Sequence, residues 1–246
     1  MRVAALYDIH GNPPALEAVL AEIPENVDLI VAGGDFLGGP RPAEVLERLR
    51  GLGERVRFIR GNAERELVDP SPPRPDGPPP EVLEAMRAKL TEEQLAFAYG
   101  VPEQLELRIE GLGRVLFCHA TPRNDEEIVT PASSESRLRE VLDGVEAVVV
   151  VAGHTHMQDD RLVDEIRFVN AGSVGMPYED APGAYWALLG PDVEFRRTEY
   201  DLGAAAEAIR ATSYPDPDEK IELLGSPHTA EEAAEVLEQR ALQGAR

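Results

Sequence analysis

Apolar residues in the first part of the chain follow two different periods. Short runs rich in Val, Ile, Leu and Ala at 3–7, 29–32 and 56–59 predict buried strands. Between these runs, apolar residues recur every three or four positions at 16–23 and 45–49, which is typical of amphipathic helices. The order strand, helix, strand, helix, strand predicts a mainly parallel sheet with helices on its faces, and hence an α/β fold.

Residues 64–104 interrupt this alternation. Seven prolines lie between Pro70 and Pro80, and they exclude a regular helix or a central strand there. Two short helices are expected after the prolines, and the second begins at the capping box that Thr91 and Gln94 can form. We interpret the segment as a small helical cap inserted at one edge of the domain.

The second half of the chain is richer in strands. Apolar runs at 105–109 and 115–118 flank a Gly-Leu-Gly turn and predict a hairpin. Residues 147–152 form a fully apolar run of the kind found in central strands. Shorter strands are expected to complete a second sheet at three places, near Phe168, at 185–189 and at 193–196.

The composition favours one domain without a membrane segment. With 246 residues, 43% of them hydrophobic, the chain can bury one sizeable core, so we expect a single domain over 1–246 with a helical tail at about 202–246. No apolar run approaches the roughly 20 residues of a membrane helix, and the strand at 3–7 leaves no room for a targeting peptide. Cys118 is the only cysteine, which fits a reducing compartment. The simplest expectation is a cytoplasmic protein.

The formal net charge of −22 argues against some classes of partner. Binding to long nucleic acid or to anionic lipid depends on Lys and Arg side chains that neutralise phosphates, so neither a nucleic acid nor a membrane is an expected partner. A small phosphorylated substrate is compatible with this charge where the site supplies positive charge of its own.

Five predicted strands are each followed at once by side chains that can bind a metal ion. The segments are Asp8-Ile9-His10-Gly11-Asn12, Gly33-Gly34-Asp35, Gly61-Asn62, His119 and Gly153-His154-Thr155-His156. Since ligands of α/β sheets bind just beyond the carboxyl ends of strands, one fold can gather all five segments around one point. Polar residues at strand ends also cap helices and complete turns, but that role does not account for the whole ordered set.

This ordered set resembles the signature of the calcineurin-like metallophosphoesterases, which runs Asp-x-His, Gly-Asp, Gly-Asn, a lone His and Gly-His-x-His. The resemblance extends from Asp8 to about Gly175. It implies a four-layer fold in which a sandwich of two sheets is flanked by helices. It also implies two cation sites, one formed by Asp8, His10 and His156 and the other by Asn62, His119 and His154, with Asp35 bridging the two.

The donor atoms agree with the resemblance. Carboxylate, imidazole and amide ligands without a thiolate suit Mn²⁺, Fe or Zn²⁺, and the sequence leaves that choice open. Two divalent ions about 3.5–4 Å apart can share a hydroxide and clamp the oxygens of an in-line displacement. The sequence therefore predicts a two-metal phosphodiesterase or phosphomonoesterase, in which a metal-bound hydroxide attacks a small phosphorylated substrate.

Ala63 departs from the family pattern. Many members carry a histidine after the Asn of the third motif, which is thought to donate a proton to the leaving group, and alanine cannot do so. General acid catalysis is typically worth about 10²–10⁴ in rate, so we expect weak turnover of esters with poor leaving groups. Arg65 and Arg123 are candidate replacements, although surface arginines are usually solvated. The alternative function is that of a metal-binding pseudoenzyme that acts as an interaction or regulatory module.

Overall fold

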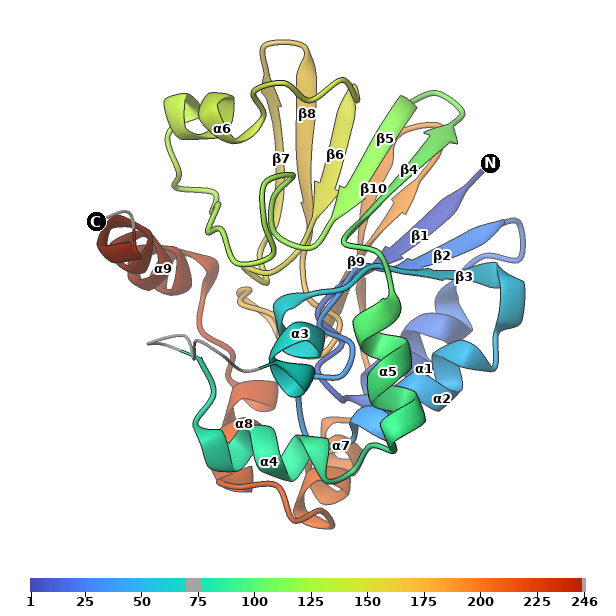
Figure 1. Cartoon of the computed structure of the whole chain (residues 1–246), viewed down its shortest axis with the longest axis vertical. Helices are drawn as coiled ribbons and strands as arrows, with labels where there is room; N and C mark the ends of the chain where they lie inside the picture. The colour runs from blue at the N-terminus through green and yellow to red at the C-terminus, as the bar shows by residue number, and fades with distance from the viewer. Residues whose placement is uncertain (70–76, 245–246) are drawn as a thin grey trace.

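The computed structural model describes residues 1–69 and 77–244, in which two five-stranded sheets pack face to face (Figure 1). The strands of the first sheet, in spatial order, are β10 (Val193–Thr198), β9 (Ala184–Leu189), β1 (Val3–Leu6), β2 (Leu29–Ala32) and β3 (Val56–Phe58). The strands of the second sheet are β4 (Gln104–Ile109), β5 (Gly113–Cys118), β6 (Val149–Ala152), β8 (Ile166–Ala171) and β7 (Gln158–Val163). The predicted α/β sandwich of two sheets is confirmed.

The parallel part of the first sheet follows the sequence pattern. Strands β1, β2 and β3 pair in parallel, and helices α1 (Pro13–Glu22) and α2 (Pro42–Arg50) form the crossovers between them. The side chain of Asn12 caps α1 by accepting a hydrogen bond from the Ala15 N–H at 3.2 Å. Every residue of β1 and β2 is buried, as expected for strands that are covered on both faces.

The prediction that strands at 185–189 and 193–196 complete the second sheet is wrong. Strand β9 pairs antiparallel with β1, where Ala4 lies opposite Leu188, and β10 extends the same sheet. All of β9 is buried, because it contacts α1 as well as β8 of the second sheet. A fully apolar strand needs cover on both faces, and its place beside β1 provides that cover. The sequence pattern also misses β7, a mostly polar edge strand that pairs with β8.

The remaining helices lie on the outer faces of the sheets and around the strand ends (Figure 1). They are a short 3₁₀ helix (Gly53–Arg55), α3 (Asn62–Val68), α4 (Pro80–Arg87), α5 (Glu92–Gly100), α6 (Glu135–Val141), α7 (Leu202–Arg210), α8 (Pro217–Gly225) and α9 (Ala230–Gly244). The pattern of apolar residues does not predict α3. None of the described helices is long and apolar enough to cross a membrane.

The capping box at the start of α5 is confirmed. The Gln94 N–H donates to Thr91 Oγ1 at 3.2 Å, and the Thr91 N–H donates to Gln94 Oε1 at 2.9 Å. The preceding helix α4 lies where the first of the two short helices is expected. Most of the proline-rich stretch, residues 70–76, lies outside the described part of the chain.

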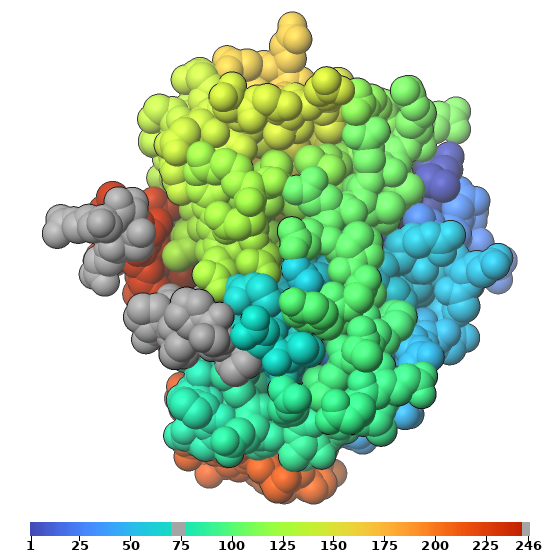
Figure 2. Space-filling view, in the orientation of Figure 1, coloured from blue at the N-terminus to red at the C-terminus, as the bar shows by residue number. Residues whose placement is uncertain are grey.

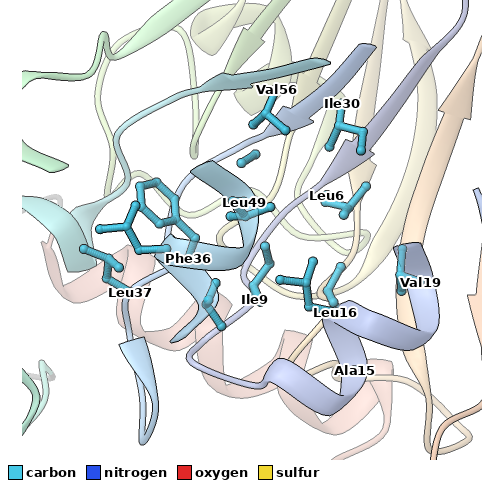
Figure 3. Close-up of a cluster of buried hydrophobic side chains, with 14 of the residues drawn as sticks. Leu6, Ile9, Ala15, Leu16, Val19, Ile30, Phe36, Leu37, Leu49 and Val56 are labelled. Carbon is cyan, nitrogen blue, oxygen red and sulfur yellow. The ribbon is translucent and has the colours of Figure 1, made fainter. Parts of the chain in front are cut away.

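Three clusters of buried side chains hold the layers together. The cluster between the two sheets includes Tyr7, Phe117 and Val151. A second cluster covers the outer face of the first sheet, where Leu16 of α1 and Leu49 of α2 lie close to the side chains of the strands (Figure 3). A third joins α6 to the outer face of the second sheet. The resulting order of helices, sheet, sheet and helix fixes the positions of the strand ends that carry the predicted ligands.

Candidate metal centre

The structure brings the seven predicted ligands together where strands of both sheets end. The first sheet supplies Asp8, His10, Asp35 and Asn62, which follow β1, β2 and β3. The second sheet supplies His119, His154 and His156, which follow β5 and β6. Strands β1 to β3 are parallel to one another, and so are β5 and β6, so each sheet presents its ligands at one edge.

One group of ligand atoms belongs to Asp8, His10 and His156, all within 4.8 Å of one another. The Nε2 atoms of His10 and His156 lie 2.9 Å apart. Asp8 Oδ1 lies 3.3 Å from His156 Nε2 and 3.7 Å from His10 Nε2. This is the set that the family resemblance assigns to the first cation.

A second group joins Asp8, Asp35 and His119 within the same 4.8 Å limit. His119 Nε2 lies 3.4 Å from Asp35 Oδ1 and 3.1 Å from Asn62 Oδ1. The other carboxylate oxygen of Asp35, Oδ2, lies 4.0 Å from His10 Nε2. Asp35 thus lies between the two groups, which is the position that a bridging ligand would take.

His154 lies beside the second group. Its ring centroid is 5.2 Å from that of His119, and its backbone N–H donates to Asp8 Oδ2 at 2.8 Å. Its Nε2 lies 3.1 Å from the carbonyl oxygen of Glu126. A hydrogen bond from Nε2–H to that carbonyl would leave Nδ1 as the basic nitrogen. The loop that carries Glu126 therefore orients the His154 ring.

The surroundings of Asp8 Oδ1 indicate whether this arrangement fits a cation. The atom is buried and has no hydrogen-bond partner, although a buried carboxylate oxygen normally has one. Its neighbours are the Nε2 atoms of His156, His10 and His119, at 3.3, 3.7 and 3.9 Å. Lone pairs that converge in this way repel one another unless a positive charge lies between them. The oxygen and nitrogen donors are those that Mn²⁺, Fe and Zn²⁺ accept.

Most of these ligands also have a strained backbone. The φ angles in the left-handed region are 52° for Asp8, 49° for His10, 52° for Asp35, 68° for His154 and 62° for His156. Among the other described residues, Asp164 and Asp216 are the only non-glycine residues with a positive φ angle. Such conformations cost about 1–3 kcal/mol each and concentrate at functional sites. The fold therefore accepts strain in order to aim these side chains.

The pKa values of the ligands show how strongly their charges interact. Burial would raise the pKa of Asp8, but the neighbouring histidine rings, His156 first, lower it overall. Burial and the ring of His156 lower the pKa of His10, which keeps that ring a neutral donor. Burial would lower the pKa of His119, but the carboxylates of Asp35 and Asp8 raise it overall. Burial raises the pKa of Asp35.

His119 and Asp35 are held by groups that lie outside both candidate ligand sets. His119 Nδ1 lies 3.0 Å from the carbonyl oxygen of Gly33, so Nε2 is the ring nitrogen that faces Asp35. Glu64 is fully buried and accepts hydrogen bonds from the backbone N–H groups of Asp35, Leu37 and Gly61, at 2.8, 2.9 and 2.9 Å. Burial and the nearby Asp35 raise the pKa of Glu64 to about 7. Glu64 does not stand out among the predicted site residues, although its position three residues after Gly61 is that of a helix-capping glutamate.

A cavity of about 1200 Å³ opens onto the ligands His10, Asp35, Asn62, His154 and His156. Its walls come from α3, from α4, from the loop at 124–128 and from helices α8 and α9. In Figure 2, the segment of α4 and α5 covers the lower part of this side of the molecule, below the segment that joins β5 to β6. Small-molecule sites typically measure about 300–1,000 Å³, so the cavity has room for an organic phosphate.

The two candidate arginines have different positions. Arg65 lines the cavity and pairs with Asp125 at 2.9 Å and with Glu126. Burial would lower the Arg65 pKa, but these carboxylates raise it overall, so the guanidinium stays charged. Arg123 pairs with Glu127 and Glu140 and is not among the described residues that line the cavity. The structure therefore brings Arg65 to the site and leaves Arg123 outside it.

Comparisons with known proteins agree with this geometry. Residues 1–190 match the family model of the calcineurin-like phosphoesterase superfamily domain. The chain is 30% identical over 198 residues to the phosphodiesterase YfcE of Escherichia coli K12, a match that covers 76% of this chain and 87% of YfcE. It is 26% identical over 247 residues to the uncharacterized protein MJ0912 of Methanocaldococcus jannaschii, covering 87% and 94% of the two chains.

Two solved structures are similar over nearly the whole chain. A metallophosphoesterase from Sphaerobacter thermophilus has a TM-score of 0.72 at 25% identity and covers 91% of this chain and 98% of its own. The hypothetical protein PH1004 from Pyrococcus horikoshii OT3 has a TM-score of 0.78 at 25% identity, and the match covers 93% of this chain and 99% of PH1004. A coverage of 93% exceeds the 190 residues of the family match, so this similarity includes part of the chain beyond that match.

Proposed function

We propose that this chain, which belongs to the calcineurin-like phosphoesterase superfamily and is a phosphoric ester hydrolase, works with two divalent cations held by its seven converging ligands. The observation that carries the proposal is the buried Oδ1 of Asp8, which has no hydrogen bond and faces three imidazole nitrogens. A phosphodiester is the first candidate substrate, because the relative YfcE is a phosphodiesterase. A phosphomonoester is the second. The cytoplasmic location expected from the sequence stays a prediction.

Each part of the site has a role in this proposal. The cations, when bound, would polarise the phosphoryl group and lower the pKa of an attacking water. Asp8 and Asp35 supply two negative charges against roughly four positive ones, so the loaded centre would stay cationic. Charges beyond a Debye length of about 8 Å are largely screened, so this local charge can attract phosphate to a chain whose net charge is −22. The Gly33 carbonyl holds the His119 ring so that its Nε2 faces Asp35.

The lack of a proton donor at Ala63 shapes the choice of substrate. Ala63 lines the cavity directly after Asn62, and its backbone N–H donates to Asp35 Oδ1 at 2.7 Å. Arg65 can stabilise negative charge in the cavity, but a guanidinium whose pKa is raised further does not release a proton. We therefore expect esters with acidic leaving groups to react best.

Hydrolysis of bis-p-nitrophenyl phosphate and p-nitrophenyl phosphate, measured with added Mn²⁺ or Zn²⁺ and after chelation, tests the proposal. Metal-dependent turnover is expected for the wild-type chain and not for Asp35→Asn or His156→Asn. Because a contaminating phosphatase would remain active in both variant preparations, their inactivity would exclude it. Two bound metal ions per chain without turnover of these esters or of common nucleotides would favour the pseudoenzyme, whose supporting feature is Ala63. Absence of bound metal would overturn both functions.

A further inference from the structure

Lys220 lines the same cavity as the candidate metal centre but comes from the C-terminal helices. It lies on α8, beyond residue 190, where the family match ends. Its side chain is partly buried, and its positive charge contributes to lowering the pKa of His10. The tail of the chain therefore adds a cation to a site whose ligands all come from the two sheets.

A short chain of contacts fixes Lys220 relative to the ligands. Lys220 Nζ lies 2.7 Å from Met176 Sδ, and Met176 also lines the cavity. The Met176 N–H donates to Ser173 Oγ at 2.8 Å, and Ser173 Oγ donates to the carbonyl oxygen of Asp8 at 2.7 Å. The ammonium group is thus held by the same loop that supports the backbone of Asp8. Ser173 takes part in this turn and is fully buried.

The ammonium group of Lys220 has donor capacity to spare. An ammonium group carries three N–H donors, and a thioether sulfur is a weak acceptor. Among the described residues, the side chain of Lys220 has no other hydrogen bond and no ion pair, whereas Arg65 and Arg137, which line the same cavity, are each paired with two carboxylates. Holding a cation against a thioether is unfavourable by itself. An anionic group bound in the cavity would compensate for that cost.

We propose that Lys220 binds a non-bridging phosphate oxygen of the substrate beside His10. The inference rests on the proposed function, since it takes the ligand of the cavity to be a phosphate ester. It also distinguishes substrates: a monoester dianion gains more from this contact than a diester monoanion. A purely structural role, in which Lys220 only packs α8 against the loop of Met176, would give no such difference.

The chain has only two lysines, Lys89 and Lys220, and this permits a direct test. Reductive methylation with carbon-13 formaldehyde gives each lysine a methyl signal in the NMR spectrum and keeps its charge. We expect the Lys220 signal of the Zn²⁺-loaded protein to shift saturably as inorganic phosphate is added. The Nζ atom of Lys89 lies 3.5 Å from Ser213 Oγ, and the signal of this lysine should not move. A Lys220 signal that stays in place at saturating phosphate would overturn the proposal.

Kinetics of Lys220→Gln, with Lys89→Gln as the matched control, test the same contact. Loss of a charged hydrogen bond should raise KM for p-nitrophenyl phosphate about 10- to 100-fold with a smaller change in kcat, and should affect the diester less. Lys220→Arg, which keeps the charge, should stay closer to the wild type. An unchanged KM in folded, metal-loaded Lys220→Gln would overturn the proposed role of Lys220 but not the proposed hydrolase function. If the wild-type protein does not hydrolyse these esters, that result contradicts the proposed function. The NMR titration with phosphate would still test the role of Lys220.

Discussion

Glu64 shows how one buried side chain can hold several parts of a site. Its two carboxylate oxygens accept three backbone hydrogen bonds, from the N–H groups of Asp35, Leu37 and Gly61. These contacts link the segments that follow β2 and β3, which carry the candidate ligands Asp35 and Asn62. The position of Asp35 therefore depends on a side chain that is not itself one of the candidate ligands.

Glu64→Ala should weaken both metal binding and stability. It leaves the buried N–H groups of Asp35, Leu37 and Gly61 without acceptors, at about 1–3 kcal/mol each, so the free energy of unfolding should fall by about 3 kcal/mol or more. Removal of such a supporting group typically lowers metal affinity about 10- to 100-fold. Urea denaturation and metal titration against a competing chelator measure the two effects.

The exposed residue Glu54 offers a control for the same substitution. Glu54→Ala makes the same change of side chain without touching the site, so both quantities should stay near their wild-type values. If Glu64→Ala lost stability but kept full metal affinity, the role of Glu64 would be confined to holding the loops together.

The side chain at position 63 should determine how the rate depends on the leaving group. For the wild type we expect rates that fall steeply as the leaving-group pKa rises across a series of aryl phosphodiesters. Ala63→His places a proton donor on the cavity wall and should raise turnover of the poorest leaving groups by up to about 10². Ala63→Gln, similar in size but not acidic, should not. A flat series in the wild type would mean that another donor serves.

The residues that could be predicted from the sequence are those in short motifs at strand ends. Asp8 and His10 share one turn of chain, and so do His154 and His156, so their grouping is visible without a structure. Lys220 gives no such signal, because it sits in a polar tail helix and reaches the cavity only through tertiary packing. Contacts between distant segments leave no local pattern to read.

The two sheets approach each other closely around Tyr7. Its hydroxyl donates to the Val151 carbonyl of the opposite sheet at 3.0 Å. A Cβ atom at Gly33 would lie 2.1 Å from the ring of Tyr7, and one at Gly153 would lie 2.4 Å from Asp8 Oδ2. Both glycines follow strands that carry ligands. Their lack of a side chain is therefore what allows the sheets to bring those ligands together.

Gly33→Ala should destabilise the protein, because overpacking of this kind costs about 1–3 kcal/mol. Gly100→Ala, at the end of α5, is the matched control: a Cβ there meets no atom within 4 Å, so stability should be unchanged or slightly higher. Thermal unfolding of both variants measures the difference. Equal melting temperatures would show that Tyr7 can move aside without cost.

The sequence predicts where most strands lie but not always which sheet they join. Strands β1, β2 and β3 alternate with helices along the chain, and that alternation specifies parallel neighbours. After β8 the chain returns to the first sheet to form β9 beside β1. The apolar pattern of β9 indicates burial but not which sheet provides it, so chain order alone assigns it to the wrong one.

The arrangement of the candidate ligands links metal binding to the stability of the two-sheet fold. Four of the seven candidate ligands come from the first sheet and three from the second, so a bound cation pair would join both layers. The unfolded chain has no such site, since its ligands are spread from residue 8 to residue 156. A ligand that binds only the folded state stabilises it by mass action, by about 2.7 kcal/mol at 100 times its dissociation constant.

Metal loading should therefore raise the melting temperature. For a domain of about 150–250 residues, 1 kcal/mol shifts the melting temperature by about 2–4 °C, so one saturated site predicts a rise of about 5–10 °C over the chelated protein. Asp35→Asn, which weakens both groups of ligands, should lose most of this rise, whereas Asp143→Asn, at an exposed position, should keep it. Differential scanning calorimetry with elemental analysis of the same samples measures both. A chain that carries two metal ions yet melts at the same temperature without them would mean that the ions do not join the two sheets.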